Sequence, residues 1–322
     1  MSPIKASIVV PAYNAGQTVR ALLEALRWQD CGQPFEVIIV DDGSTDDTAA
    51  IVAGYPHVRY FRQTNAGPAS ARNCGARHAL GDILLFTDSD CCPRPDWIRR
   101  MLSGFSDDSI TAVTGSYGIA NPRNMLANVI HTEIVLRHRF LMPEFPKVLG
   151  SYNFAVRKDF FHALGGFNQD YRRASGEDND LGYRILAARG RIHFLRDALV
   201  DHYHQTSLGK YLQEQFRHGV WRAKMYFDHP RMATGDNYTF WKDMFEVPAT
   251  WTVGVAIIWP GLFWGLGLAL FLFLFEAAFG VWGMRSLGGG GFAGSVMFAR
   301  AFARSSGFVA GGIKLALACG KR

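Results

Sequence analysis

The sequence is poor in the features that mark disulfide-rich, metal-scaffolded and nucleic-acid-binding proteins. Its 322 residues contain five cysteines, an odd number, and Cys91 and Cys92 are adjacent. This pattern has neither disulfide spacing nor metal-ligand spacing, so we expect small buried thiols in a reducing compartment. Lysine and arginine form no run dense enough to indicate nucleic acid, and no nucleic-acid partner is expected.

Two further shortages concern the ends of the chain. The N-terminus lacks the charged and then apolar pattern of a secretory signal, so the soluble part is expected to stay in the cytoplasm. Residues 247–282 are almost without charge and carry only Glu276, whereas the first two thirds of the chain read as soluble. The formal net charge of +6 suits phosphate-bearing substrates or an anionic membrane surface.

One stretch of the soluble part combines a buried strand with paired acids. Residues 83–86 are apolar, Thr87 ends the run, and Asp88 and Asp90 follow at positions i and i+2. In an extended chain these two carboxylates point the same way, and they repel each other unless a cation lies between them. Hard oxygen ligands favour Mg²⁺ or Mn²⁺ bound together with substrate phosphates. A solvated Asp-Ser-Asp turn is the alternative.

Strands and helices alternate ahead of this stretch. Strands are predicted at residues 7–10, 35–40 and 58–61, with an amphipathic helix between the first two. This order predicts a βαβ unit with a right-handed crossover, in which ligands bind beyond the carboxyl ends of the strands. There Asp42 either binds a ribose or base or caps the next helix. Arg72, in the first half of a later helix, either binds phosphate oxygens or is a surface arginine.

Four motifs follow one another in this region: Ser7-Ile8-Val9-Val10-Pro11-Ala12-Tyr13-Asn14, Asp41-Asp42-Gly43-Ser44, Gly67-Pro68-Ala69-Ser70-Ala71-Arg72-Asn73 and Thr87-Asp88-Ser89-Asp90. Together they resemble the family 2 inverting glycosyltransferases, over roughly residues 5–220. The resemblance implies an α/β GT-A fold, which is Rossmann-like with a mostly parallel sheet, and a nucleotide-sugar site. The residues that it implies for donor binding are Pro11, Tyr13, Asp42 at the base, Arg72 at the nucleotide and Asp88 at the ribose. The divalent cation would be bound by Asp90 and Asp88.

A second set of motifs resembles the acceptor and catalytic regions of the same family. Residues 150–157 are similar to the floor of the acceptor site, which implies acceptor binding by Asn153. Residues 175–181 resemble the Glu-Asp motif, which implies that Asp178 is the general base, with Glu177 beside it and Asp180 at the acceptor. Helix capping is the alternative for these acids, because the helix dipole favours acids in a first turn. Asn168 is a minor departure from the family pattern.

Further residues refine this resemblance. His202 and His204 lie where a family histidine reaches the metal or the diphosphate, and we favour His202 as the metal ligand. Residues 214–218 stand where processive relatives carry Gln-x-x-Arg-Trp, but Glu214 and His218 replace the outer residues. This departure argues against a processive polysaccharide synthase.

The last third of the chain predicts membrane association. Residues 208–228 place aromatic beside basic side chains, which suits either a headgroup-level helix or a helix that packs on the domain. Residues 247–282 exceed the roughly twenty residues that one span needs. Pro260-Gly261 allows a kinked span or a re-entrant hairpin, and Gly288 to Gly291 predicts a flexible break. Residues 292–319 would then span or lie in the interface; a soluble pair of core helices is the alternative.

The expected organisation is a GT-A domain at 1–205, an interfacial helical connection at 206–246 and membrane-associated helices at 247–322. The expected reaction moves a sugar from a nucleoside-diphosphate sugar to an acceptor hydroxyl with inversion. We expect a lipid-linked or membrane-proximal glycan acceptor at the cell (inner) membrane, with the catalytic domain in the cytoplasm. Alternatives are a polyprenyl-phosphate sugar transferase, a nucleotidyltransferase and a non-catalytic nucleotide-binding membrane protein. A nucleotidyltransferase would carry a Gly-rich, Lys-bearing loop after the first strand, where residues 11–14 have none.

Overall fold

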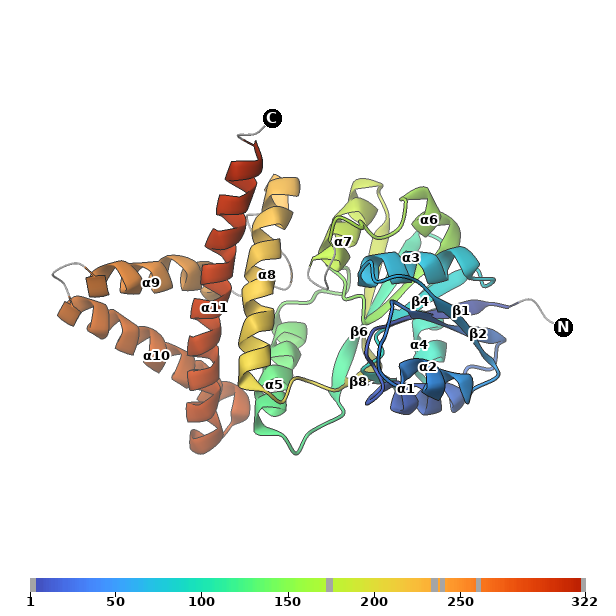
Figure 1. Cartoon of the computed structure of the whole chain (residues 1–322), viewed down its shortest axis with the longest axis horizontal. Helices are drawn as coiled ribbons and strands as arrows, with labels where there is room; N and C mark the ends of the chain where they lie inside the picture. Colours follow the sequence, from blue (N-terminus) through green and yellow to red (C-terminus); the bar gives the residue numbers. More distant parts are fainter. Residues whose placement is uncertain (1–3, 172–175, 233–236, 238–240, 259–261, 320–322) are drawn as a thin grey trace. The chain divides into compact units, whose positions relative to one another are not determined.

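The chain divides into two compact units. The computed structural model describes residues 4–171, 176–232, 237, 241–258 and 262–319 (Figure 1). The first, which we call the α/β unit, comprises Met1–Ala120 and Met142–Tyr203. The second, the helical unit, comprises Asn121–Leu141 and His204–Arg322. The α/β unit is therefore interrupted in sequence by a segment that folds with the C-terminal helices.

The α/β unit is built on one sheet. Its strands are β1 (Ala6–Ala12), β2 (Phe35–Asp41), β3 (Val58–Arg62), β4 (Ile83–Thr87), β5 (Cys91–Pro93), β6 (Ile110–Ile119), β7 (Asn153–Arg157) and β8 (Arg191–His202). They form an eight-stranded sheet in the order β3-β2-β1-β4-β7-β6-β8-β5. The pairs β3–β2, β2–β1, β1–β4 and β6–β8 are parallel, and the pairs that involve β7 or β5 are antiparallel. The predicted α/β fold is confirmed.

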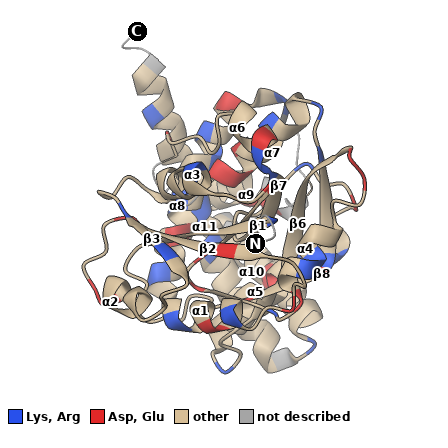
Figure 2. Ribbon diagram, turned by 90° about the vertical axis from the view of Figure 1, so that its right-hand side faces the viewer, with Lys and Arg blue, Asp and Glu red and all other residues tan. Residues whose placement is uncertain are grey.

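Helices cover both faces of this sheet (Figures 1 and 2). On one face lie α1 (Val19–Arg27), α2 (Thr48–Ala53) and α4 (Trp97–Ser103); on the other lie α3 (Pro68–His78), α6 (Lys158–Ala163) and α7 (Glu177–Ala187). The side chains of β1 point alternately to the two faces of the sheet, so that Ile8 and Val10 pack with α1 on one face and Val9 packs with α3 on the other. Burial on both faces explains why the central strands read as continuous apolar runs.

The sheet brings the predicted donor-binding residues to one edge. Ala12 is the register partner of Asp41, so Tyr13 and Asp42 leave neighbouring parallel strands at the same edge, where β4 also ends. Gly75 in α3 lies against Val9 with no space for a Cβ atom, which lets α3 pack closely over β1. This close packing places the N-terminal half of α3 beside the same edge.

The helical unit contains α5 (Met125–Phe140), α8 (Leu208–Asp228), the 3-10 turn η1 (Pro230–Met232), α9 (Trp241–Ile258), α10 (Leu262–Met284) and α11 (Leu287–Cys319). Helices α8 and α11 run side by side (Figure 1). Their backbones touch because Gly219 faces the carbonyl of Arg304 and Gly307 faces that of Phe216. The segment 208–228 therefore packs on α11 through Tyr211, Gly219 and Ala223.

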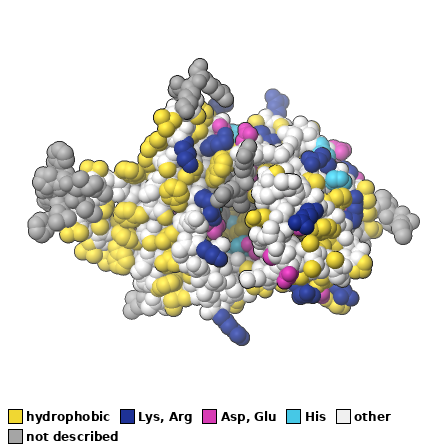
Figure 3. Space-filling model, in the orientation of Figure 1, with side chains coloured by type: hydrophobic (Ala, Val, Ile, Leu, Met, Phe, Trp, Pro, Cys, Tyr) yellow, Lys and Arg dark blue, Asp and Glu magenta, His cyan; other side chains and the backbone are white. Residues whose placement is uncertain are grey.

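One segment of the described helices, Gly265–Met284 in α10, is long and apolar enough to cross a membrane. Large apolar side chains of α10 are exposed, and Figure 3 shows apolar side chains gathered over α9 and α10; the exposed ones in α10 are Leu266, Leu270, Phe271, Leu274 and Trp282. Pro260-Gly261, for which we predicted a kink or hairpin, lies outside the described residues.

The flexible break predicted at Gly288 to Gly291 is wrong. These glycines lie in the first turns of α11, and the chain turns instead at Arg285, which has a φ of 51°, and Ser286. The glycines serve packing, because Gly290 faces Val281 and Gly294 faces Ala277 with no space for a Cβ atom. A run of glycines that allows two helices to pack closely looks, in the sequence alone, like a flexible linker, and this explains the wrong prediction.

Candidate active site

A buried arginine joins two acids that are far apart in sequence. Arg72 is 1% exposed, and its guanidinium donates to Asp88 Oδ1 at 2.6 Å and to Glu177 Oε1 at 2.9 Å. Burial alone disfavours the arginine charge, but the charges of Asp88 and Glu177 outweigh it and raise the pKa of Arg72. The arginine therefore ties the end of β4 to the start of α7.

The neighbours of Arg72 fix its position. Its guanidinium lies 5.4 Å from the ring centre of Phe167. Asn73 donates to the Phe167 carbonyl and accepts from the Phe167 amide, each at 2.8 Å. The sequence analysis did not predict these Asn73–Phe167 hydrogen bonds. The position of Asn73, directly after Arg72 in the same motif, could have indicated that Asn73 has a role at the site. The Gly165-Gly166-Phe167 turn thus supports the site from outside it.

Asp178 lies next to this ion-pair cluster, in the first turn of α7. The side chain is half-buried and accepts a hydrogen bond from the Asn179 amide at 2.8 Å. Burial and the charge of Glu177 raise its pKa to about 7, against the opposing effects of the Asn179 amide and Arg72. A carboxyl group with a pKa near neutrality is suited to exchange protons at neutral pH. Gly176 is the N-cap residue directly before this helix, and its φ of 103° favours glycine.

The two residues predicted to bind acceptor are held by protein groups. Asn153 is 0% exposed, accepts from Trp97 Nε1 at 2.8 Å and donates to the carbonyls of Ser116 and Ala198. Asp180 is also buried and binds Arg184 at 2.8 Å, and Arg184 in turn donates to the carbonyls of Leu164 and Gly166. The structure does not bring either side chain to the surface.

Asp90 and His202 meet at the pairing of β5 with β8. His202 Nε2 lies 3.4 Å from Asp90 Oδ1, and the Cys91 sulfur belongs to the same group of ligand atoms, all within 4.8 Å. Asp90 and Asp88 have partly exposed side chains. This donor set of carboxylate oxygens and an imidazole nitrogen fits Mg²⁺ or Mn²⁺. His204 belongs to the helical unit, where its amide donates to Asn121, and it does not share this cluster.

The predicted base-binding acid supports a loop. The Asp42 carboxylate accepts from the backbone amides of Ala66 at 2.9 Å and Gly67 at 2.8 Å, and from the Gln63 side chain at 2.7 Å. It therefore holds the turn that precedes α3. Pro11 is buried at the end of β1, whereas Tyr13 is 54% exposed beyond it. Tyr13 is thus available to a ligand at this edge.

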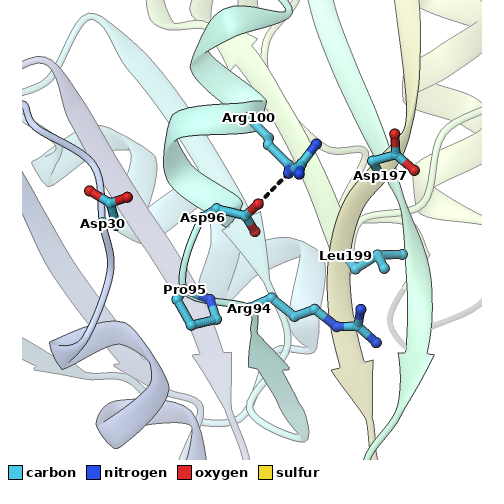
Figure 4. Close-up of a pocket in the computed structure, with 7 residues that line it drawn as sticks. All are labelled: Asp30, Arg94, Pro95, Asp96, Arg100, Asp197 and Leu199. Carbon is cyan, nitrogen blue, oxygen red and sulfur yellow. Dashed lines mark hydrogen bonds and ion pairs between the residues drawn. The ribbon is translucent and has the colours of Figure 1, made fainter.

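A shallow pocket lies on another face of β8 (Figure 4). It is lined by Asp30, Arg94, Pro95, Asp96, Arg100, Asp197 and Leu199. Leu199 alternates along β8 with Val200 and His202, so it points away from the His202 side. The pocket is therefore separate from the residues predicted from sequence.

Two family models of glycosyltransferases match this chain. Residues 7–165 match the family model described as "Glycosyl transferase family 2", and residues 131–207 match "N-terminal domain of galactosyltransferase". A pre-mycofactocin glycosyltransferase of Mycobacterium tuberculosis is 30% identical over 70% of this chain and 48% of that protein. A validoxylamine A glucosyltransferase of Streptomyces hygroscopicus is 29% identical over 56% of this chain and 51% of that protein.

A solved structure has the same fold. The mannosyltransferase PcManGT from Pyrobaculum calidifontis, in complex with GDP-Man and Mn²⁺, gives a TM-score of 0.64 at 18% identity. The match covers 96% of this chain and 89% of that one. By contrast, the chain spans about half the length of the curated relatives named above.

Proposed function

We propose that the chain is a family 2 glycosyltransferase, whose family model residues 7–165 match, and that it transfers a sugar from a nucleoside-diphosphate sugar to an acceptor hydroxyl, with inversion. The observation that carries the proposal is the Arg72 bridge. It binds Asp88 at the donor edge of the sheet and Glu177, the neighbour of Asp178, at 2.6 and 2.9 Å. A single buried guanidinium thereby couples the donor edge to the helix that supplies a proton acceptor.

Asp178 acts as the general base in this proposal. An acceptor hydroxyl is a weak nucleophile until its proton is removed, and its attack on the anomeric carbon expels the nucleoside diphosphate from the opposite face. With a pKa of about 7, roughly half of the Asp178 carboxyl groups are ionised at neutral pH, and the carboxylate is basic enough to take the proton. Glu177, held by Arg72, positions the first turn of α7.

Asp90 and His202 would bind the divalent cation, Mg²⁺ or Mn²⁺, with Asp88 nearby. When bound, the cation supplies positive charge that stabilises the departing diphosphate. The chain's own contribution is to hold the Asp90 oxygen and the His202 nitrogen 3.4 Å apart, with Asp90 directly before β5 and His202 at the end of its partner strand β8. Tyr13 and Pro11 flank the nucleotide, and Asp42 positions the loop that meets its base.

The acceptor is a lipid-linked or membrane-proximal glycan. The support for this proposal is the apolar segment Gly265–Met284 with its exposed leucines. In this arrangement residues 1–205 act in the cytoplasm, 206–246 connect at the interface and 247–322 associate with the cell membrane. Asn153 and Asp180 would shape the acceptor side through Trp97 and Arg184.

Metal-dependent nucleotide binding tests the proposal. Calorimetry with UDP and with GDP, each with and without Mn²⁺, is expected to show cation-dependent binding of one of them to the wild-type protein. Asp90→Asn keeps the side-chain shape but removes an anionic ligand, so this dependence is expected to disappear. The control is Asp201→Asn on the same strand pair, where Asp201 binds Arg94 at 3.1 Å. Equal cation-dependent affinity in Asp90→Asn would contradict the assignment.

A further inference from the structure

The thiol of Cys91 lies beside the two side chains proposed to bind the cation. Its sulfur is 4.0 Å from Asp90 Oδ1, and it shares a group with His202 Nε2 in which all atoms lie within 4.8 Å. We propose that Cys91 is a third protein ligand at this site, which lets the site that takes Mg²⁺ or Mn²⁺ also bind borderline-soft cations such as Zn²⁺ and Co²⁺ through sulfur. The inference rests on the proposed cation site at Asp90 and His202.

The backbone places these three residues together. Cys91 and His202 are direct partners in the antiparallel pairing of β5 with β8, so their side chains emerge on the same face. The Asp90 carbonyl accepts from the Tyr203 amide at 2.9 Å, which fixes the residue before Cys91 against the end of β8. A site built on paired strands holds its ligands more accurately than one built on loops.

The separations are close to those of a metal centre. Bond lengths of about 2.3 Å to sulfur and about 2.0–2.2 Å to nitrogen and oxygen put tetrahedral ligand atoms roughly 3.3–3.6 Å apart. His202 and Asp90 already meet this condition at 3.4 Å. The sulfur lies 4.0 Å from Asp90 Oδ1 and within 4.8 Å of the histidine nitrogen, so it must approach the two ligand atoms by up to roughly 1.5 Å by this measure.

The exposure of the three residues suits entry of an ion. The side chains of Asp90 and His202 are 44% and 20% exposed, whereas Cys91 is 0% exposed and forms the floor. On binding, the Cys91 S–H bond breaks, its electron pair forms the sulfur–metal bond, and the proton leaves to solvent. Thiolate sulfur favours Zn²⁺ and Co²⁺, whereas Mg²⁺ prefers oxygen.

The competing interpretation is that Cys91 only fills space. It belongs to the same core cluster as Trp97 and Val200, and a buried cysteine packs as a small hydrophobic residue. The adjacent Cys92 offers a matched control, because it is half-buried, pairs with Asp201 and points to the opposite face of β5.

The test is a Co²⁺ titration of the full-length protein after removal of metal by chelation. The wild-type protein and Cys92→Ser are expected to show the near-ultraviolet charge-transfer absorption of a thiolate–cobalt bond, and Cys91→Ser and His202→Ala are expected to lose it. Zn²⁺ affinity measured by calorimetry is expected to fall at least about tenfold in Cys91→Ser, while Mg²⁺ affinity stays unchanged. Cys91→Ala, which introduces no buried hydroxyl, replaces the serine variant if that protein melts at a lower temperature.

Two results would overturn the inference: a wild-type Co²⁺ complex without the sulfur band, or a band that survives in Cys91→Ser or Cys91→Ala. Neither result depends on sugar transfer. Cation-dependent nucleotide binding without the sulfur band would leave the proposed function standing and remove Cys91 from the site. A sulfur band without any nucleotide binding would retain the Cys91 ligand and contradict the proposed function.

Discussion

A single arginine organises the candidate site, and its side chain explains why. Arg72 presents a planar fork that binds two carboxylates at once, whereas lysine offers a point charge. Because Glu177 is 2% exposed, loss of the arginine would remove a cationic partner from a buried carboxylate, which is costly. The same contact that positions the first turn of α7 therefore also stabilises the fold.

Arg72→Met is expected to lower the free energy of unfolding by about 3–5 kcal/mol, the usual cost of removing one partner from a buried ion pair. Arg100→Met is the matched control. Its partner Asp96 lies at 2.5 Å, but both side chains are partly exposed, and such pairs contribute about 0–1 kcal/mol. Urea unfolding of the two variants measures the difference. Equal losses in the two proteins would show that the Arg72 bridge does not stabilise the fold.

Asp178 gives the site a pH dependence of defined sign. Its pKa is raised to about 7, and a general base must be ionised to work. We therefore expect kcat/KM for sugar transfer to rise with pH and to level off above about 7, with a one-proton transition. An activity that is flat between pH 5 and about 8 would contradict this role.

The same carboxyl group is expected to lower stability at high pH. Since the folded pKa lies above the unfolded value, the folded state binds more protons between about pH 4 and 7, and stability falls as pH rises through that window. Asp178→Asn carries no such charge, so it should melt above the wild-type protein by more at pH 8 than at pH 5, and the two proteins should converge below about pH 4. Calorimetric melting temperatures at the two pH values check this expectation.

At the scale of whole elements, the helical unit is held by a buried ion-pair network. Arg137 of α5 binds Glu133 at 2.5 Å and Asp243 of α9 at 2.7 Å. Arg300 of α11 binds the same Glu133 and also Glu246 of α9, the latter at 2.7 Å. Helix α5, which the sequence places between β6 and β7, is thus tied to the C-terminal helices.

Removal of Arg300 should loosen this network. Arg300→Met leaves Glu133 with one cationic partner fewer and Glu246 without its 2.7 Å partner, and a loss of about 3–5 kcal/mol is expected. Lys314→Met on the exposed face of α11 is the control, for which we expect a change within about 0.5 kcal/mol. Thermal unfolding in detergent measures both. A destabilisation no larger than that of the control would show that the network is dispensable.

The sequence predicted local structure better than side-chain roles. Strands and helices of the first ninety residues lie where apolar periodicity and turn residues put them, because these signals act over a few neighbouring positions. The Arg72–Glu177 contact joins residues 105 positions apart, and no local pattern encodes it. Asn153 lies in a motif that predicted acceptor binding, yet its side-chain amide accepts a hydrogen bond from Trp97 and donates one to the Ser116 carbonyl. From the sequence alone, a polar residue that binds a ligand cannot be distinguished from a polar residue that is buried and bonded within the protein.

At the scale of the whole molecule, our proposal assigns membrane attachment to the apolar surface of α10. The full-length protein is expected to resist carbonate extraction from membranes. Gln substitution of Leu266, Leu270 and Leu274, all exposed, should release it, because polar side chains in hydrocarbon are costly. The control is Gln substitution of Trp28 and Leu80, which are exposed in the α/β unit. Release of the unmodified protein by carbonate would contradict insertion of α10.

The central claim is that Asp178 takes the proton from the acceptor at a site that binds a nucleotide sugar. Asp178→Asn preserves size and shape, so nucleoside-diphosphate affinity with Mn²⁺ should stay at the wild-type value. Glu177→Gln, which weakens the contact with Arg72, serves as the neighbouring comparison.

The most direct test is single-turnover sugar transfer to membrane lipid extract, measured for both variants with the nucleotide sugar whose diphosphate binds most tightly. We predict that Asp178→Asn loses about 10²–10⁴-fold in rate with donor binding intact, and that Glu177→Gln loses less. Transfer by Asp178→Asn at close to the wild-type rate, or a larger loss in Glu177→Gln, would contradict this prediction.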